Sequence, residues 1–322
     1  MSPTNLVDSQ TLVAGLARSG TTWLAKLLDS HPATLYRHEP DRPPQFPKMP
    51  VLVALEQVGR YGDQLRQFTQ ALPDLHRIRT SGTLPVFRKA NESSLKFHTR
   101  RTLTATLRLT ERMLGNIRLP EVLQYRPSDR FCLVWKSVWS VGRLGVIAEA
   151  TRPDNIILLL RHPCGVFASR HRGIEQRKMS PVSGEEINEL LADRSQTATQ
   201  LLARIDRADQ FDVETFRWAL LYSKAINEIA DRPGRLIVRY EDLCAHPERE
   251  MRRILAAIDL PWDRQVERFI RRSTTTTSPR FYGLHRKPES VDTWRREIPR
   301  GVQERVQKII RGTTAGRFYS SE

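Results

Sequence analysis

Residues 11–28 read TLVAGLARSGTTWLAKLL, and this stretch indicates the fold more clearly than any other part of the chain. The apolar run Thr11–Leu16 predicts a strand, and Thr22–Leu28 predicts a helix that stops before Pro32. The turn between them contains glycines, which let the backbone approach a ligand closely. N–H groups at the start of a helix favour anions. The stretch therefore predicts an anion-binding turn between a strand and a helix.

The spacing of this turn is that of Gly-x4-Gly-Lys-Ser/Thr, with one departure. Thr21 stands where a nucleotide-hydrolysing loop has its lysine, which reaches the β- and γ-phosphates. Arg18 supplies positive charge within the turn instead. This argues against ATP or GTP as a phosphoryl donor.

Further apolar runs alternate with helical patterns along the chain. The predicted strands are Thr34–Tyr36, Phe131–Trp135, Asn155–Leu160 and Leu236–Tyr240. This order predicts an α/β, P-loop-like three-layer fold with a central parallel sheet flanked by helices. Residues 1–322 are expected to form a single domain with a helical insertion at roughly 40–130, near the carboxyl edge of the sheet, where it would shape a substrate pocket.

The composition is basic, with 52 Lys and Arg against 36 Asp and Glu, a net charge of +16. This balance favours anionic partners such as nucleic acid, an acidic membrane, or a ligand bearing phosphate or sulfate. No nucleic-acid-binding pattern is present, so we expect no nucleic-acid partner. Residues 1–10 do not resemble a signal peptide, and no apolar stretch approaches the ~18 residues of a membrane span. The three cysteines are scattered and do not suggest disulfides. We therefore expect a cytoplasmic protein.

Residues 18–24 read RSGTTWL and are followed by Ser30-His31-Pro32. This segment resembles the 5′-phosphosulfate loop of sulfotransferases, which use 3′-phosphoadenosine-5′-phosphosulfate (PAPS). The resemblance implies that PAPS is the co-substrate. The residues implied to bind it here are Arg18, Ser19, Gly20, Thr21, Thr22 and Trp23.

Three further segments resemble the same family in the same order. Arg161 follows the run NIILLL, and Ser169 comes eight residues later. In the family, this arginine and serine bind the 3′-phosphate, and a guanidinium at a strand end can converge with a helix hydroxyl on one anion. Tyr240, in the run RYEDL, resembles a tyrosine near the cofactor. Asp292-Thr293-Trp294 resembles the last element, and the resemblance implies that the preceding Arg286 and Lys287 also bind cofactor.

Glu39 is the candidate general base. In the tyrosylprotein, carbohydrate and several bacterial sulfotransferases, a glutamate after the second strand is the base, and Tyr36-Arg37-His38-Glu39-Pro40 occupies that place. Pro40 predicts an extended backbone at Glu39, which would present the side chain at the strand end. His38 and His98 remain alternative bases.

Lys136, at the end of the third strand, is the second catalytic candidate. In the tyrosylprotein branch, a lysine there approaches the sulfate, and the resemblance implies a general acid or an electrostatic clamp on the leaving group. Ser137 is a lesser candidate. The hydroxyl-rich run Ser273–Ser278 is a further candidate contact, with no hydroxyl singled out.

The predicted reaction moves a sulfuryl group from PAPS to a hydroxyl or amine of a small-molecule or glycan acceptor: a carbohydrate, a glycolipid or another small metabolite. We expect no metal, because His162, Cys164 and His171 lack the spacing of zinc ligands. The alternative is a P-loop nucleotide kinase or NTPase. It would need a loop lysine and an acidic magnesium ligand, which only Glu241-Asp242 could imitate.

Overall fold

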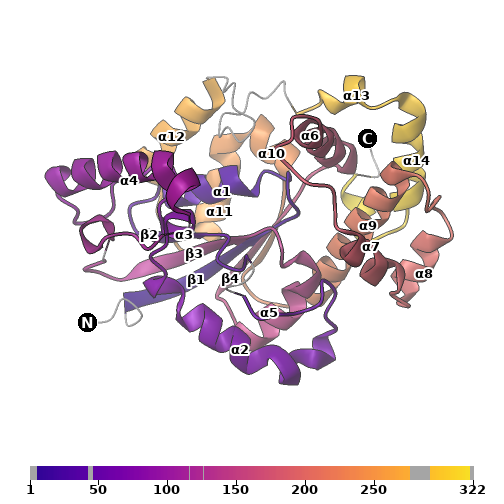
Figure 1. Cartoon of the computed structure of the whole chain (residues 1–322), viewed down its shortest axis with the longest axis horizontal. Helices are drawn as coiled ribbons and strands as arrows, with labels where there is room; N and C mark the ends of the chain where they lie inside the picture. Colours follow the sequence, from indigo (N-terminus) through magenta and orange to yellow (C-terminus); the bar gives the residue numbers. More distant parts are fainter. Residues whose placement is uncertain (1–5, 43–45, 116, 126, 276–290, 320–322) are drawn as a thin grey trace.

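A computed structural model describes residues 6–42, 46–115, 117–125, 127–275 and 291–319. Its centre is a five-stranded sheet in the order β2-β3-β1-β4-β5, and all paired strands are parallel (Figure 1). The strands are β1 (Val7–Ala14), β2 (Thr34–His38), β3 (Phe131–Ser137), β4 (Asn155–Leu160) and β5 (Arg235–Arg239). All five predicted strands are present. Tyr240, predicted to end the last strand, instead opens a helix.

Helices cover both faces of the sheet, which confirms the three-layer fold. The helices α1 (Thr21–Asp29), α10 (Tyr240–Ala245), α11 (Pro247–Ala257) and α12 (Arg264–Thr275) pack on one face (Figure 1). The other core involves α5 (Leu144–Thr151), α6 (Pro163–Glu175), α7 (Gly184–Leu191), α8 (Gln196–Leu202), α9 (Gln210–Glu228), α13 (Trp294–Glu297) and α14 (Arg300–Ile310). Along β4, Ile157 and Leu158 point into opposite cores, as expected for a strand buried on both sides.

Between β2 and β3 the chain is mainly helical. The elements are η2 (Leu55–Gln57), α2 (Val58–Gln70), η3 (Leu72–Asp74), α3 (Ile78–Ser81), α4 (Ser94–Leu114) and η4 (Glu121–Leu123). Tyr61 and Leu65 of α2 join the core beside α5. In contrast, α4 lies at the edge of the molecule, with Leu95 80% exposed (Figure 1).

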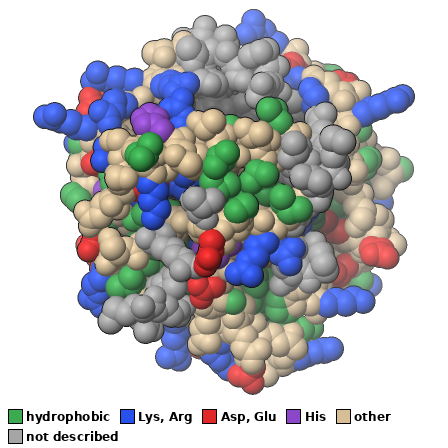
Figure 2. All heavy atoms as spheres, turned by 60° about the vertical axis from the view of Figure 1, so that its left-hand side comes forward, with side chains coloured by type: hydrophobic (Ala, Val, Ile, Leu, Met, Phe, Trp, Pro, Cys, Tyr) green, Lys and Arg blue, Asp and Glu red, His purple; other side chains and the backbone are tan. Residues whose placement is uncertain are grey.

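The described helices include none with the length and apolar character needed to cross a bilayer. Lys and Arg side chains are scattered over the face shown in Figure 2 rather than gathered into one stripe. The net charge therefore singles out no site on that face.

A buried ion cluster attaches the insertion to α1. Asp29 accepts hydrogen bonds from Lys26 Nζ at 2.7 Å and Lys89 Nζ at 2.9 Å, and Lys26 also donates to Thr83 O at 2.9 Å. Burial alone would raise the pKa of Asp29, but the two ammonium groups outweigh it and lower that pKa to about 2. The carboxylate thus links two cations that lie far apart in sequence.

We expect Asp29→Ala to lower the free energy of unfolding by about 3–5 kcal/mol, because it leaves two buried ammonium groups without their counter-ion. Urea denaturation measures the change. The control is Asp8→Ala, which removes a surface pair with Arg130 (3.1 Å) and is expected to cost at most about 1 kcal/mol. Equal losses in the two variants would contradict a special role for the buried cluster.

Candidate active site

The turn between β1 and α1 requires glycine at two positions. Gly20 has φ 95°, and a Cβ there would lie 2.4 Å from Tyr240 Cδ2. A Cβ on Gly15 would lie 2.6 Å from Leu159 O of β4. Because a left-handed φ and such close approach both exclude a side chain, these glycines set the compact shape of the turn. Trp23 N and Leu24 N bond to Gly20 O, so the N–H groups that precede them at the start of α1 are the ones that suit an anion.

Tyr222 of α9 holds this turn by hydrogen bonds. This residue was not identified from the sequence. Its hydroxyl is 2.7 Å from Ser19 Oγ, accepts from Leu16 N at 2.9 Å and donates to Leu159 O at 2.9 Å. Burial raises the pKa of Tyr222 to about 12, which keeps this hydroxyl protonated. Tyr222 lies in an apolar helical pattern far along the chain, so nothing in the sequence marks it as a partner of Ser19.

The structure brings Arg18, Arg161 and Ser169 together. Arg18 Nε donates to Ser169 Oγ at 2.9 Å, and Arg161 Nη1 donates to Arg18 O at 3.0 Å. Arg161 is 8% exposed, and its buried Nε has no hydrogen-bond partner among the residues that the structure describes. Two guanidinium groups and a hydroxyl at the carboxyl end of β4 form a site suited to a phosphate group, and the unpartnered Nε has capacity for one more acceptor.

Tyr240 and Trp23 pack around the turn. The Tyr240 ring lies against Gly20, its centroid 4.6 Å from Arg161 Cζ and 6.4 Å from the Trp23 ring in an edge-to-face contact. Trp23 is fully buried, and its Nε1 donates to Ser273 Oγ at 3.0 Å. The Trp23 side chain thus lies in the packing beneath the turn.

The hydroxyl-rich run Ser273–Ser278 begins in the last turn of α12, which ends at Thr275. Ser273 holds Trp23, whereas the Thr274 and Thr275 hydroxyls bond to backbone carbonyls of their own helix. Residues 276–278 lie outside the described residues, as do Arg286 and Lys287.

Asp292-Thr293-Trp294, the last segment that resembles the family, lies beside Arg161. The Trp294 ring stacks on His162 with 4.2 Å between centroids, and Trp294 Cδ1 would be 3.3 Å from a Cβ on Gly165.

Glu241 accepts from His162 N at 2.9 Å and from the Tyr319 hydroxyl at 3.0 Å. Each carboxylate oxygen of Glu241 thus accepts a hydrogen bond within the protein.

Glu39 and Lys136 form an ion pair at the carboxyl ends of β2 and β3. Glu39 Oε1 accepts from Lys136 Nζ, and the same ammonium lies 3.3 Å from Thr22 Oγ1 at the start of α1. Lys136 is buried, whereas the Glu39 side chain is 22% exposed. This arrangement places a carboxylate and an ammonium directly beside the β1–α1 turn.

The expectation of an extended backbone at Glu39 is wrong. Its φ is 43°, in the left-handed region, despite the following proline. Glu39 N still pairs with Lys136 O at 2.9 Å, and the chain then turns at once, so that Arg42 N reaches Glu39 O at 3.3 Å. The ladder bond and this turn together outweigh the local preference that Pro40 imposes. A non-glycine residue held in this region is typical of functional sites.

The surroundings of Glu39 keep it ionised. Burial would raise its pKa, but Lys136 and His38 outweigh it and lower the pKa of Glu39 to about 2. Burial and Lys136 lower the pKa of His38 to about 3, so this imidazole is neutral. Its Nδ1 is 2.7 Å from the Tyr36 hydroxyl, and its Nε2 is 3.8 Å from Glu39 Oε1.

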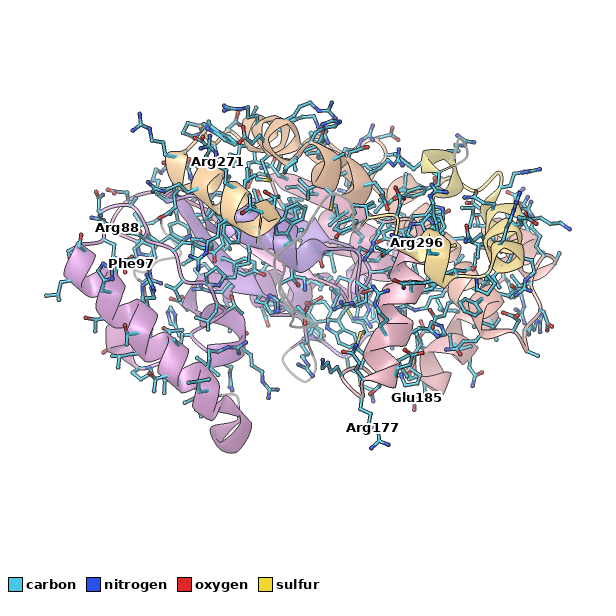
Figure 3. The ribbon with its side chains drawn as sticks, turned by 90° about the horizontal axis from the view of Figure 1, so that it is seen from above. Arg88, Phe97, Arg177, Glu185, Arg271 and Arg296 are labelled. Atoms are coloured by element: carbon cyan, nitrogen blue, oxygen red, sulfur yellow. The ribbon has the colours of Figure 1, made fainter. Side chains whose placement is uncertain are left out.

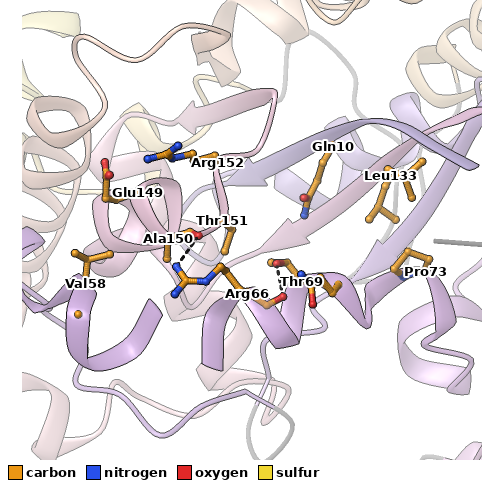
Figure 4. A pocket seen from close by; sticks show the side chains of 13 residues that line it. Gln10, Val58, Arg66, Thr69, Pro73, Leu133, Glu149, Ala150, Thr151 and Arg152 are labelled. Carbon is orange, nitrogen blue, oxygen red and sulfur yellow. Dashed lines mark hydrogen bonds between the residues drawn. The ribbon is translucent and has the colours of Figure 1, made fainter. Parts of the chain in front are cut away.

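The other candidates lie elsewhere. His98 is exposed in α4, and its ring contact among the described residues is Phe97, which Figure 3 shows at the outer end of that helix. Ser137 donates to buried Asp41, a residue that the sequence did not single out. A cavity of about 740 Å³ lies at the opposite edge of the sheet, between α2 and α5, where Arg66 Nη1 donates to Ala150 O at 3.4 Å (Figure 4). It includes none of the predicted site residues.

Comparison with known proteins gives one family. Residues 11–264 match the profile of the group described as "Sulfotransferase family". No curated protein sequence matches the chain.

Solved structures with a similar arrangement are distant in sequence. The sulfotransferase domain from the curacin biosynthetic pathway is 17% identical, with 93% of this chain and 95% of that chain covered and a TM-score of 0.43. The sulfotransferase domain of the Synechococcus PCC 7002 olefin synthase is 16% identical, with coverages of 99% and 97% and a TM-score of 0.45. A mouse sulfotransferase, SULT7A1, solved in complex with PAP, is 10% identical, with coverages of 99% and 92% and a TM-score of 0.44.

Proposed function

This chain belongs to the sulfotransferase family, and on that premise we propose that it transfers a sulfuryl group from PAPS to a hydroxyl or amine of a carbohydrate, glycolipid or other small metabolite. One observation carries the proposal: Arg18, Arg161 and Ser169 meet at one end of the β1–α1 turn, while the Glu39–Lys136 pair meets Thr22 at the other. Two anion sites and a carboxylate thus lie along one edge of the sheet, as a bis-anionic nucleotide donor requires.

The donor would be held by both ends of this arrangement. The N–H groups at the start of α1 and the Thr22 hydroxyl bind the 5′-phosphosulfate, and Arg161 with Ser169 binds the 3′-phosphate. The Arg18 guanidinium bonds to Ser169, so we assign this side chain to the 3′-phosphate end. When bound, PAPS supplies a sulfuryl group attached to a phosphate leaving group.

Glu39 and Lys136 would share the proton and charge transfers. Glu39 takes the proton from the hydroxyl or amine that receives the sulfuryl group, and Lys136 stabilises negative charge near Thr22. In the ion pair, Glu39 is a weak base, with its pKa lowered to about 2 by Lys136 and His38 against the effect of burial. When the phosphosulfate of the donor lies at Thr22, the Lys136 ammonium interacts with two anions. Its interaction with Glu39 is then weaker, and the proton affinity of Glu39 rises. The pair therefore couples donor binding to the strength of the base.

The decisive experiment has two measurements. Addition of 3′,5′-adenosine bisphosphate is expected to raise the melting temperature of the purified protein, because it binds the folded state. Radiolabelled PAPS, incubated with a panel of hydroxyl and amine acceptors, is expected to transfer its label. The absence of any affinity for the bisphosphate, or magnesium-dependent ATP turnover in its place, would refute the assignment.

Tyr222→Phe tests the support beneath the turn. It removes the hydroxyl that joins Ser19, Leu16 and Leu159, so we expect a loss of about 1–3 kcal/mol in stability and weaker binding of the bisphosphate. Calorimetry on the variant measures both. Tyr125→Phe is the matched control, because that hydroxyl donates to Ala90 O at 3.0 Å within the insertion. Unchanged nucleotide affinity in Tyr222→Phe would show that the turn keeps its shape without this support.

A further inference from the structure

Trp139 is an exposed aromatic residue in the turn that follows β3, three residues after Lys136. Its side chain is 44% exposed, and the other large apolar residues that the structure describes as exposed are the leucines Leu84, Leu95, Leu103 and Leu109 of the insertion. Trp139 follows Lys136 by three residues, so their Cα atoms are at most about 11 Å apart. Nearly half of this large apolar side chain is therefore open to water and to a ligand.

A buried polar cluster fixes the turn that carries Trp139. Ser137 Oγ accepts from Trp139 N at 3.1 Å and from Ser140 N at 3.0 Å, and it donates to Asp41 Oδ2. Ser140 Oγ donates to the same oxygen at 2.5 Å. Ser137 and Ser140 are fully buried and Asp41 is 1% exposed. Asp41 Oδ1 has no hydrogen-bond partner among the described residues, but Trp139 N, Ser140 N and both serine hydroxyls are bonded within the cluster, which ties the backbone of Trp139 to Asp41.

The same cluster connects Trp139 to the candidate base. Asp41 lies two residues after Glu39, and Ser137 directly follows Lys136. The carboxylate of Asp41 therefore ties the turn after β2 to the turn after β3. Any shift of Asp41 moves Trp139 relative to the Glu39–Lys136 pair.

We propose that Trp139 is the platform on which the acceptor stacks, that the acceptor presents a six-membered ring to it, and that Asp41 is the residue that positions this platform. This inference rests on the proposed function. An indole offers a flat apolar surface that packs against the C–H face of a sugar or against an aromatic ring, whereas a flexible acyclic alcohol makes little use of it. The hydroxyl of a ring seated on Trp139 is then within reach of Glu39.

The test measures ring binding with the full chain saturated in 3′,5′-adenosine bisphosphate. Saturation-transfer NMR follows three probes: methyl β-D-glucopyranoside for a sugar ring, 4-nitrophenol for an aromatic ring, and 1-hexanol as the acyclic comparison. We expect at least one ring probe to bind more tightly than hexanol, and the probe that does so identifies the type of ring. Trp139→Ala is expected to weaken that probe on the order of tenfold, and Trp139→Phe to weaken it less.

The control is Trp262→Ala. Trp262 packs under Arg252, 3.8 Å from the guanidinium carbon to the ring centroid, just before α12 and away from the Glu39–Lys136 pair. Its removal is expected to leave ring binding unchanged. Equal ring affinity in wild type and Trp139→Ala, or no preference for rings in the wild type, would overturn the proposal. Bisphosphate affinity is expected to be equal in the wild type and Trp139→Ala, so its absence in the wild type would identify a failure of the proposed function instead.

Asp41 is tested by a pair of substitutions. Asp41→Ala removes the oxygen that receives both serine hydroxyls, and we expect ring binding to fall as in Trp139→Ala while bisphosphate affinity is retained. Asp41→Asn keeps one amide oxygen for those serines and is expected to restore most of the ring affinity. A structural role alone would lower nucleotide and ring binding together, and that outcome would refute the positioning role.

Discussion

Glu39→Gln is expected to lower sulfuryl transfer by about 10²–10⁴-fold while 3′,5′-adenosine bisphosphate binds as before. Glutamine still accepts the hydrogen bond from Lys136, but it does not take a proton from the acceptor. The variant therefore keeps the geometry at Thr22 and loses the base. Single-turnover transfer from labelled PAPS measures the rate, and calorimetry measures nucleotide affinity.

His38→Asn is the matched control for this prediction. The His38 ring lies with its Nδ1 2.7 Å from the Tyr36 hydroxyl and its Nε2 3.8 Å from Glu39 Oε1, so we assign it a supporting role and expect the variant to retain most of its turnover. Unchanged turnover in Glu39→Gln, or a loss confined to His38→Asn, would exclude Glu39 as the base.

The pH dependence of stability follows from the same ion pair. Lys136 and His38, against the effect of burial, lower the pKa of Glu39 from 4.5 to about 2, so its contribution to stability is fully present above pH 4.5. That contribution is lost as the pH falls from about 4.5 through about 2. We therefore expect the stability difference between wild type and Glu39→Gln to shrink over this range when denaturation is measured at successive pH values. A difference that stays constant would show that the carboxylate gains nothing from Lys136.

Arg161→Ala is expected to weaken binding of 3′,5′-adenosine bisphosphate by about 100-fold. A charge-assisted hydrogen bond contributes about 1.5–3 kcal/mol, and the substitution also removes the bond from Arg161 Nη1 to Arg18 O that supports the turn. Ser169→Ala, which removes a single hydroxyl, is expected to cost about tenfold. Arg161→Lys keeps the charge but not the planar fork, and we expect an intermediate loss.

A second nucleotide makes this prediction specific. AMP lacks the 3′-phosphate, so the wild type is expected to prefer the bisphosphate strongly, whereas Arg161→Ala should show little preference between the two. Equal weakening of both nucleotides would instead indicate that Arg161 acts only by supporting the turn.

The sequence was informative wherever function depends on a short segment. The proposed role of the glycine turn depends on its own backbone, so the seven residues RSGTTWL were enough to predict it. Arg161 and Lys136 each end an apolar run, and parallel strands bring their carboxyl ends to one edge. That rule placed both side chains at one edge of the sheet, and the family resemblance implied that Arg161 and Ser169 bind one anion; the contacts of Arg18 with both residues come from the structure.

The errors and omissions arose where distant segments meet. The backbone at Glu39 is left-handed because a ladder bond to Lys136, nearly one hundred residues away, competes with the local effect of Pro40. Tyr222 and Asp41 act by hydrogen bonds to residues remote in the chain, and neither belongs to a pattern that marks it in advance. Whether Trp139 would be buried or exposed was equally beyond local reasoning.

The strands along the chain, the glycine turn after the first of them and the family follow from the amino-acid sequence, because hydrophobic period and loop composition are local properties. The pairing of Glu39 with Lys136, the support of Ser19 by Tyr222 and the presentation of Trp139 by Asp41 come from tertiary packing alone. Each depends on the distance between atoms of different strands or helices, and that distance is set only when the sheet and its two cores assemble.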